Sequence, residues 1–165
     1  MADEAGLSLR PIRSEDHHYV LELNQRHVDL LSPMDADRLG YLIDHADRAD
    51  VLEVDGERAG FVFTFAPGAG YDGENFAWFG DRFGADFYYL DRVVVDDAFR
   101  RRGLGAAAYD ELERAAAPYR RMVLEVNSDP PNEPSLAFHR GRGYVDVGTR
   151  GEPGHRVAML SRELS

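Results

Sequence analysis

The chain has 165 residues, 30 of them acidic and 19 basic, which gives a formal net charge of −11 at pH 7. This length suits one domain, residues 1–165, and the negative field disfavours nucleic acids and anionic membranes as partners. There are no cysteines, which excludes disulfides and thiolate chemistry. The six histidines follow no metal-ligand spacing, so we expect no metal. Because the start resembles no signal peptide and no apolar stretch approaches about 18 residues, we expect a cytoplasmic protein.

The first third of the chain predicts one strand and two helices. Residues 7–12 alternate apolar and polar side chains, as a short strand does. Ser14 is placed to cap the helix that follows, and the segment SPMD separates this helix from a second one. The apolar positions of the two helices are Val20, Leu23 and Leu30 in the first and Leu39, Leu42, Ile43 and Ala46 in the second.

The middle of the chain predicts three strands. Residues 50–54 and 59–65 form a hairpin around the turn Asp55-Gly56. A long, mostly apolar strand follows at residues 86–95. We expect a loop rich in glycine and aromatic residues over the intervening residues 66–86.

The last third alternates helices and strands. A helix begins after Gly103 and ends at Pro118, and a strand covers residues 121–126. A helix that starts with proline follows within residues 131–143, and a closing hairpin turns at the segment GEPG. This order of elements predicts one α/β domain with a mixed sheet.

The junction between strand 86–95 and the next helix has the features of a phosphate site. Gly103 and Gly105 permit a sharp turn and the close approach of a ligand. The first amide groups of a helix are unpaired and lie at the positive end of its dipole. Arg100, Arg101 and Arg102 add positive charge in an acidic chain. Because glycine turns and solvated arginine runs also occur without ligands, this segment alone leaves the question open. A Rossmann interpretation fails because the glycine turn comes late in the chain, after a β-meander.

Two motifs in register resemble one known family. The segment from Arg100 to Gly105, RRRGLG, resembles the R/Q-x-x-G-x-G/A pyrophosphate loop of the GNAT superfamily of N-acetyltransferases. Residues 123–144, VLEVNSDPPNEPSLAFHRGRGY, are similar to its strand followed by N-x-x-A/S-x-x-F/L-Y-x-x-x-G-F/Y, with His139 in place of the tyrosine. The resemblance implies an α/β acyl-CoA N-acyltransferase fold. Its mostly antiparallel sheet of about seven strands is splayed between strands four and five and flanked by about four helices.

The resemblance implies acetyl-CoA as the acyl donor, bound where strand 86–95 and strand 121–126 separate. The backbone near Val93 and Val95 would pair with the pantetheine arm as an added strand does. Phe138 would pack near the cofactor, or serve as a core aromatic residue instead. The cofactor-binding residues predicted in this way are Val93, Val94, Val95, Arg100, Arg101, Arg102, Gly103, Leu104, Gly105, Ala106, Asn132, Ser135 and Phe138.

An amine acceptor arrives protonated and needs a base. Asp91 is the predicted base, because related enzymes often carry glutamate at this place in the strand. Strand alternation predicts that Asp91 shares a face with Tyr89 and Val93. The alternatives are that Asp91 only pairs with an arginine, or that Glu125 in the opposite strand is the base.

The leaving thiolate needs a proton donor. His139 is the predicted acid, since it occupies the position of the family tyrosine, although Tyr88 or Tyr89 would serve if His139 binds the cofactor or the backbone instead. Without a cysteine, direct attack of the amine on the thioester is the simpler route.

The acceptor is predicted to be a primary amine of a small molecule or a peptide. Trp78, Phe79 and Tyr89 are the predicted substrate-binding residues. The aromatic segment around them has three interpretations: a lid over the acceptor, a contact that would make a homodimer, or a cover for one sheet face. An alternative function is that of a catalytically inactive acyl-CoA-binding module.

Overall fold

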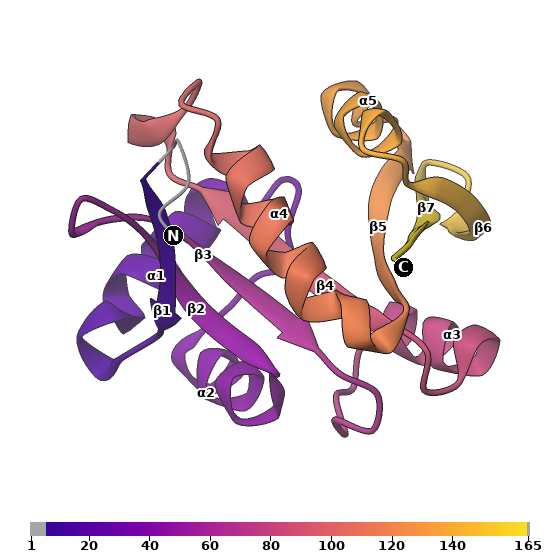
Figure 1. The fold of residues 1–165 in the computed structure, drawn as a ribbon, viewed down its shortest axis with the longest axis horizontal. Helices are drawn as coiled ribbons and strands as arrows, with labels where there is room; N and C mark the ends of the chain where they lie inside the picture. The colour runs from indigo at the N-terminus through magenta and orange to yellow at the C-terminus, as the bar shows by residue number, and fades with distance from the viewer. Residues whose placement is uncertain (1–5, 165) are drawn as a thin grey trace.

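A computed structural model describes residues 6–164, so the two ends of the predicted domain, at residues 1 and 165, lie outside the described residues. Seven strands form one mixed sheet in the order β1-β2-β3-β4-β5-β7-β6 (Figure 1). The strands are β1 (Leu7–Pro11), β2 (Arg48–Val54), β3 (Glu57–Phe65), β4 (Tyr88–Val95), β5 (Arg121–Asp129), β6 (Val145–Glu152) and β7 (His155–Glu163). The helices are α1 (His17–Arg26), α2 (Ala36–His45), α3 (Glu74–Phe83), α4 (Leu104–Ala116) and α5 (Glu133–Gly141). The predicted fold class is confirmed.

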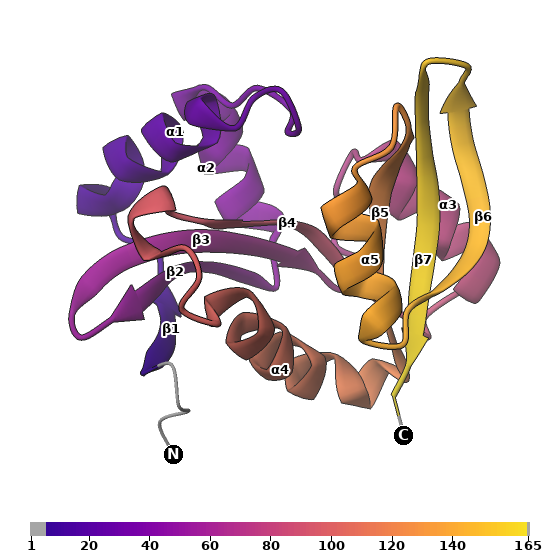
Figure 2. The ribbon, with the colours of Figure 1, turned by 90° about the horizontal axis from the view of Figure 1, so that it is seen from above.

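The sheet separates two hydrophobic cores. Helices α4 and α5 cover one face, where Leu112 and Leu136 pack with Leu124 of β5. Helices α1, α2 and α3 cover the other face, where Leu39 and Phe79 belong to a second buried cluster. Figure 2 shows α1 and α2 on one side of strands β1 to β4 and α4 on the other. Most apolar side chains of both helix sets are thus removed from water, which stabilises the sheet between them.

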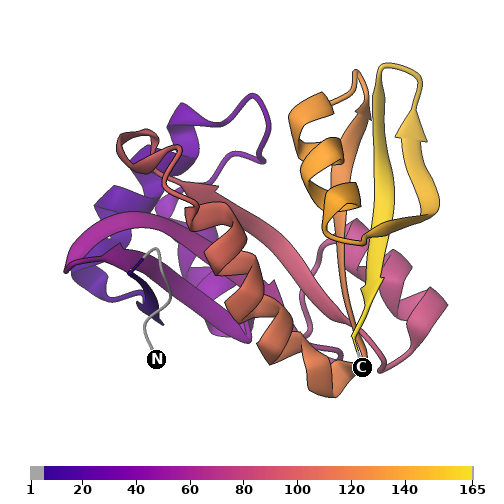
Figure 3. The ribbon, with the colours of Figure 1, turned by 45° about the horizontal axis from the view of Figure 1, so that its top comes forward.

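Strands β4 and β5 pair over only two residues and then separate. Their parallel ladder joins Tyr88 to Met122 and Tyr89 to Val123. Beyond that point β4 continues along β3, and β5 continues along β7. Figure 3 shows the two strands diverging from their shared end. Residues 90–95 of β4 therefore have no β5 partner, as the predicted splay requires.

A β-bulge at Asp91 changes the faces of β4. In the ladder with β3, Phe63 lies opposite Arg92 and Thr64 lies opposite Leu90, so Asp91 is the extra residue. Tyr89 belongs to the core under α1 to α3, whereas Val93 packs against the core under α4. The prediction that Tyr89 and Val93 share a face was wrong, because the bulge interrupts the alternation between them.

The predicted loop at residues 66–86 contains helix α3, so the loop prediction was wrong. Phe76, Phe79 and Phe83 recur at intervals of three and four, which is the spacing of one helix face. Phe76 and Phe79 are buried in the second core. The segment therefore covers a sheet face, as one of the three interpretations held, and the homodimer stays a prediction.

The start of α1 also differs from its prediction. Ser14 lies in a short 3-10 turn, Ser14–Asp16, that precedes the α-helix. The helix ends at Arg26, and Leu30, predicted to lie on its apolar face, is beyond that end and 58% exposed.

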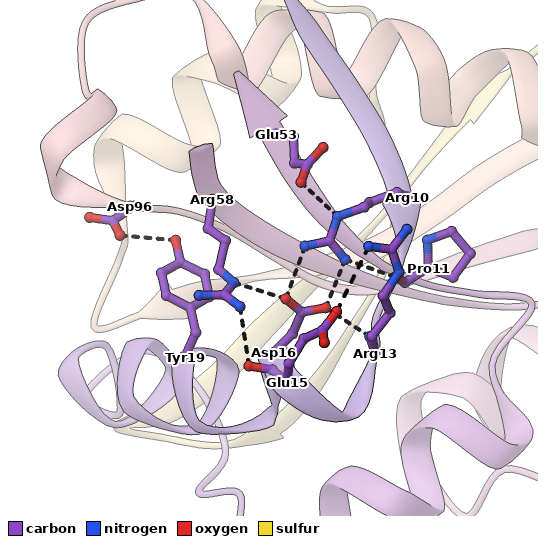
Figure 4. A network of polar contacts seen from close by, with 9 residues as sticks. All are labelled: Arg10, Pro11, Arg13, Glu15, Asp16, Tyr19, Glu53, Arg58 and Asp96. Carbon is purple, nitrogen blue, oxygen red and sulfur yellow. Dashed lines mark hydrogen bonds and ion pairs between the residues drawn. The ribbon is translucent and has the colours of Figure 1, made fainter. Parts of the chain in front are cut away.

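The buried carboxylate of Asp16 ties β1 and β3 to the start of α1 (Figure 4). Asp16 accepts hydrogen bonds from Arg10 at 2.7 and 2.9 Å, from Arg58 at 2.8 Å and from the backbone N–H of Arg13 at 2.8 Å. Nearby, the Tyr19 hydroxyl donates to Asp96 at 2.9 Å, which connects α1 to the segment after β4. These bonds, those from Arg10 above all, hold the pKa of Asp16 well below its usual range.

Replacing this carboxylate tests the network. A group with a depressed folded pKa contributes stability above its unfolded pKa of about 3.9, and the contribution is lost as pH falls towards the folded value. Asp16→Asn is therefore expected to lower the free energy of unfolding by about 3–5 kcal/mol at pH 7 and by less at pH 3. Urea denaturation at the two pH values measures both. The exposed Asp44→Asn is the control, and an equal loss for Asp16→Asn at both pH values would contradict the account.

Candidate active site

A cavity of about 400 Å³ lies where β4 and β5 separate. Residues 90–93 of β4 and 124–127 of β5 form its two walls, and α5 contributes Ser135 and His139. A wider opening of about 880 Å³ shares residues 30–32 and Asn132 with the cavity and forms its mouth. The cavity thus occupies the place where the sheet has no backbone ladder.

Arg92 anchors the segment that covers the cavity. This side chain is buried, and its Nη1 donates to Asn24 Oδ1 at 3.1 Å and to the Ser32 carbonyl at 3.2 Å. Asn24 Nδ2 donates to the same carbonyl at 3.0 Å. Hydrogen bonds from β4 and α1 therefore hold residues 30–32 in place through the Ser32 carbonyl.

The segment after β4 presents an open helix N-terminus. Gly103 adopts a φ of +73° directly before α4, a conformation that favours glycine. The first intrahelical bond runs from the Ala107 N–H to the Gly103 carbonyl, so the amides of residues 104–106 precede the helical ladder. A Cβ atom added to Gly103 or Gly105 would meet no atom within 4 Å. The amides of residues 104–106 are thus available as donors to an anion at the positive end of the helix dipole.

The three arginines before this helix are exposed. Arg100 Nη2 lies 2.8 Å from Asp97, and the Arg102 guanidinium lies 5.0 Å from the centre of the Phe99 ring. Both contacts leave the cationic groups at the surface of the loop. Positive charge thus accompanies the helix N-terminus in an otherwise acidic protein.

Asp91, the predicted base, has both carboxylate oxygens occupied. Its Oδ1 accepts from the Tyr71 hydroxyl at 2.6 Å, and its Oδ2 accepts from Arg92 Nε at 2.7 Å. The side chain is only 7% exposed. Its assignment as base stays a prediction, and the geometry makes it a buried partner of Arg92.

Glu125 is the carboxylate on the opposite wall. Its Oε1 accepts from the Tyr89 hydroxyl at 2.7 Å, and its side chain lines the cavity. Enclosure raises the pKa of Glu125 to about 7, and the charge of Asp91 adds to this rise. Hydrogen bonds from Tyr89 and Asn75 and the charge of Arg92 oppose it. Glu125 therefore exchanges a proton near neutral pH.

His139 is buried, and both of its ring nitrogens have partners. Its Nδ1 lies 2.7 Å from the Ser135 carbonyl, and its Nε2 lies 2.6 Å from the Tyr109 hydroxyl. Burial lowers the pKa of His139, so the imidazole is neutral at pH 7. Because a carbonyl only accepts, Nδ1 carries the hydrogen and Nε2 accepts from Tyr109.

The structure brings three of the predicted cofactor residues to the cavity. Val93, Asn132 and Ser135 line the cavity, and Asn132 Oδ1 also caps α5 by accepting from the Ser135 N–H at 3.3 Å. Phe138 packs edge-on against Tyr109 at 5.1 Å between ring centres. The side chain of Val94 is buried in the second core, on the α1 to α3 face.

Two of the three predicted substrate residues lie away from the cavity. Phe79 is fully buried in the second core, and Trp78 lies against Gly148 of β6. Tyr89 is buried but reaches the cavity wall through Glu125. Neither Trp78 nor Phe79 is brought to the cavity.

Sequence reasoning missed Tyr109 as a residue of the cavity. It follows Ala108 on the buried side of α4, where a bulky residue suggests core packing. The one available signal was a hydroxyl at a buried helix position, since buried tyrosine hydroxyls need partners.

The comparisons with known proteins fit this geometry. The sequence pattern of the acetyltransferase (GNAT) family matches residues 9–144. The chain belongs to this family. A search of curated proteins found no match.

Several solved GNAT structures share the fold. Ard1 from Thermoplasma volcanium is 17% identical with a TM-score of 0.73, covering 97% of this chain and 99% of that one. The ribosomal-protein-S18-alanine N-acetyltransferase from Escherichia coli is 16% identical with a TM-score of 0.68, covering 96% and 94%. Arabidopsis thaliana NAA60 in complex with acetyl-CoA is 15% identical with a TM-score of 0.70, covering 96% and 99%. At these identities the likeness concerns the fold.

Two further properties concern the described chain. Within residues 6–164, no three or more histidine and carboxylate side chains come together in a way that could hold a metal ion. No helix in this range has the length and apolar character needed to cross a membrane.

The environment of Glu125 predicts two opposite pKa changes. Tyr89→Phe removes a hydrogen bond that favours the carboxylate, so the pKa of Glu125 is expected to rise above about 7. Asp91→Asn removes a neighbouring negative charge, so the pKa is expected to fall. NMR titration of protein labelled with ¹³C at the glutamate carboxyl groups measures both, with the surface carboxylate Glu133 as an internal control. Shifts of the same sign in the two variants would contradict the assignment.

Proposed function

We propose that the protein is an acetyl-CoA-dependent N-acetyltransferase that acts on a primary amine of a small molecule or peptide. The observation that carries the proposal is the cavity between β4 and β5, which combines an unpaired strand edge with a carboxylate of near-neutral pKa. Membership of the GNAT family supports the reaction class. The acetyl-CoA in the NAA60 complex supports the choice of donor.

The donor would lie across three features of the site. The pantetheine arm would pair with the free edge of β4 near residues 93–95, as an added strand does. The diphosphate would accept from the amides of residues 104–106, and Arg100–Arg102 would add charge. Asn132, Ser135 and Phe138 would border the arm on the α5 side. The thioester would then reach the part of the cavity next to Glu125.

Glu125 is the base in this proposal, with Asp91 as a charged neighbour. The acceptor amine is protonated at neutral pH and must lose a proton before or as it attacks. A base works best when its pKa lies near the working pH, and Glu125 meets this condition. Both carboxylate oxygens of Asp91 already accept hydrogen bonds from Tyr71 and Arg92, so Asp91 is the weaker candidate.

The amine would attack the thioester directly while both substrates are bound, since the chain has no cysteine for a covalent intermediate. The acceptor would enter through the mouth between residues 29–32 and residues 129–134, where Asp29, Asp129 and Glu133 favour a cationic amine. The ribosomal-protein-S18-alanine N-acetyltransferase, which has the same fold, makes the amine of an alanine in a protein one class to try first. The donor and the cysteine-free composition support a cytoplasmic location.

Removing the base tests the mechanism. Glu125→Gln is expected to lower kcat by about 10²–10⁴-fold with little change in the KM for acetyl-CoA. The wild-type rate should fall as pH drops below about 7, because Glu125 becomes protonated. Release of free thiol from acetyl-CoA with alanine-initiated and serine-initiated peptides, polyamines and amino acids measures this, with the exposed Glu22→Gln as the control. Wild-type turnover in Glu125→Gln would remove this residue from the assignment.

A bulky side chain at Gly105 tests the diphosphate site. Gly105 and Gly40 are both helical glycines with no atom within 4 Å of an added Cβ. Leucine improves helix propensity at either position, so both variants should fold. Gly105→Leu is expected to weaken coenzyme A binding at least about tenfold in calorimetry, whereas Gly40→Leu should bind normally. Equal affinity in the two variants would place the diphosphate elsewhere.

A further inference from the structure

The proposed function leaves one proton unassigned. When the amine displaces coenzyme A, the leaving sulfur carries negative charge, and a thiolate with a reference pKa of about 8.5 is stabilised by a nearby donor. Glu125 accepts a proton and does not supply this one. The inference below rests on the proposed function and concerns the group that gives its proton to sulfur.

His139 is poorly placed to be that donor. Its Nδ1–H is given to the Ser135 carbonyl of its own helix, and its Nε2 is an acceptor for Tyr109. The Ser135 hydroxyl lies 3.3 Å from the same Nδ1, so this nitrogen is directed to polar groups of its own helix. A neutral imidazole in this state has no N–H to offer to a ligand.

Tyr109 has the proton that His139 lacks. Its hydroxyl lies 2.6 Å from His139 Nε2, and the residue lines the cavity from α4. The charged groups that act on this phenol are Glu125 across the cavity, Glu113 on its own helix and Arg142, whose guanidinium lies 5.5 Å from the ring centre. Burial and the two carboxylates raise its pKa above the usual range, so it remains protonated while Glu125 is ionised.

The Tyr109 ring is also fixed in place. Phe138 and Tyr144 pack edge-on against it at 5.1 and 6.3 Å between ring centres, and His139 does so at 5.2 Å. The free movement that remains is rotation of the hydroxyl hydrogen about the C–O bond. This hydrogen can leave Nε2 and turn to a charged acceptor in the cavity without any motion of the ring.

We propose that Tyr109 is the catalytic acid that protonates the leaving sulfur, and that His139 is the positioning residue that holds its hydroxyl. The role of the family tyrosine at position 139 thus passes to a tyrosine of another helix. The Ser135 carbonyl fixes the His139 tautomer, and that tautomer directs the Nε2 lone pair to Tyr109.

The acceptor nitrogen attacks the thioester carbonyl carbon, the C–N bond forms, and the nitrogen gives a proton to Glu125. The C–S bond then breaks, its electron pair goes to sulfur, and the proton of Tyr109 forms the S–H bond of coenzyme A. As the products leave, the tyrosinate takes a proton from water and Glu125 returns one to water. Amine and acetyl-CoA become amide and coenzyme A with no net gain or loss of protons.

The thiol of bound coenzyme A gives a test that needs no acceptor. If the Tyr109 hydroxyl donates to sulfur, it stabilises the thiolate and lowers the thiol pKa, which ultraviolet thiolate absorbance measures. Tyr109→Phe is expected to raise this pKa by about one unit. Tyr144→Phe is the matched control, since it removes a hydroxyl from the same ring cluster that donates to Glu113 at 2.7 Å. Calorimetry and thermal unfolding confirm that each variant is folded and binds coenzyme A.

Turnover of acetyl-CoA separates the roles of the two residues. Tyr109→Phe is expected to lower kcat at least about tenfold with an unchanged KM for acetyl-CoA. His139→Gln, whose amide oxygen can accept from Tyr109 in place of Nε2, should retain more activity than His139→Phe. Equal losses in both His139 variants with normal turnover in Tyr109→Phe would make His139 the acid and overturn the proposal.

The acetyltransferase function and the role of Tyr109 are tested by different results. An unchanged thiol pKa in Tyr109→Phe overturns the role of Tyr109 and leaves the acetyltransferase function intact. Wild-type protein that binds no coenzyme A overturns both. If Glu125→Gln transfers acetyl groups as fast as the wild type, Glu125 is not the base. The thiol pKa then still decides whether Tyr109 is the acid.

Discussion

The separation of β4 from β5 is the constraint on which the rest of the structure depends. The two strands share only the pairs Tyr88 with Met122 and Tyr89 with Val123. The bulge at Asp91 lies directly beyond these pairs and bends β4 away along β3. A sheet edge that would otherwise be buried is thereby opened over residues 90–95. The cavity lies along this edge.

The ionisable groups of the site differ in their surroundings, and these surroundings set their roles. Asp91 and Glu125 lie on facing strands, but Asp91 is paired with Arg92 whereas Glu125 receives only neutral donors. The charge of Asp91 adds to the rise in the pKa of Glu125. Burial also raises the pKa of Tyr109. The phenol therefore keeps its proton and can donate it, whereas Glu125 can accept one. One cavity thus holds a proton acceptor and a proton donor at the same pH.

Much of the fold was predictable because local signals agreed with one another. Gly103 and Gly105, the apolar strand before them and the helix after them all indicated one topology, and RRRGLG lies between β4 and α4 as expected. The failures have physical reasons. The bulge at Asp91 depends on pairing with β3, which alternation within one strand does not reveal. Helix α3 was hidden by Gly80, by the glycines that flank it and by its aromatic residues, although Phe76, Phe79 and Phe83 have helical spacing.

The candidate site was predictable only where a motif named it. Glu125 remained a reserve candidate, because its raised pKa comes from enclosure by residues far away in the sequence. Tyr109 gave no motif signal, since its contact with His139 joins two helices that are 30 positions apart. The sequence shows that His139 replaces the family tyrosine. It does not show that Tyr109 lies beside His139, because that contact depends on how α4 packs against α5.

A crystal structure with coenzyme A tests the central claim most directly. The account predicts the pantetheine arm between β4 and β5, the diphosphate at the amides of residues 104–106, and the sulfur within hydrogen-bonding reach of the Tyr109 hydroxyl. A cofactor bound outside this cavity, with β4 and β5 still apart and unoccupied, would contradict it.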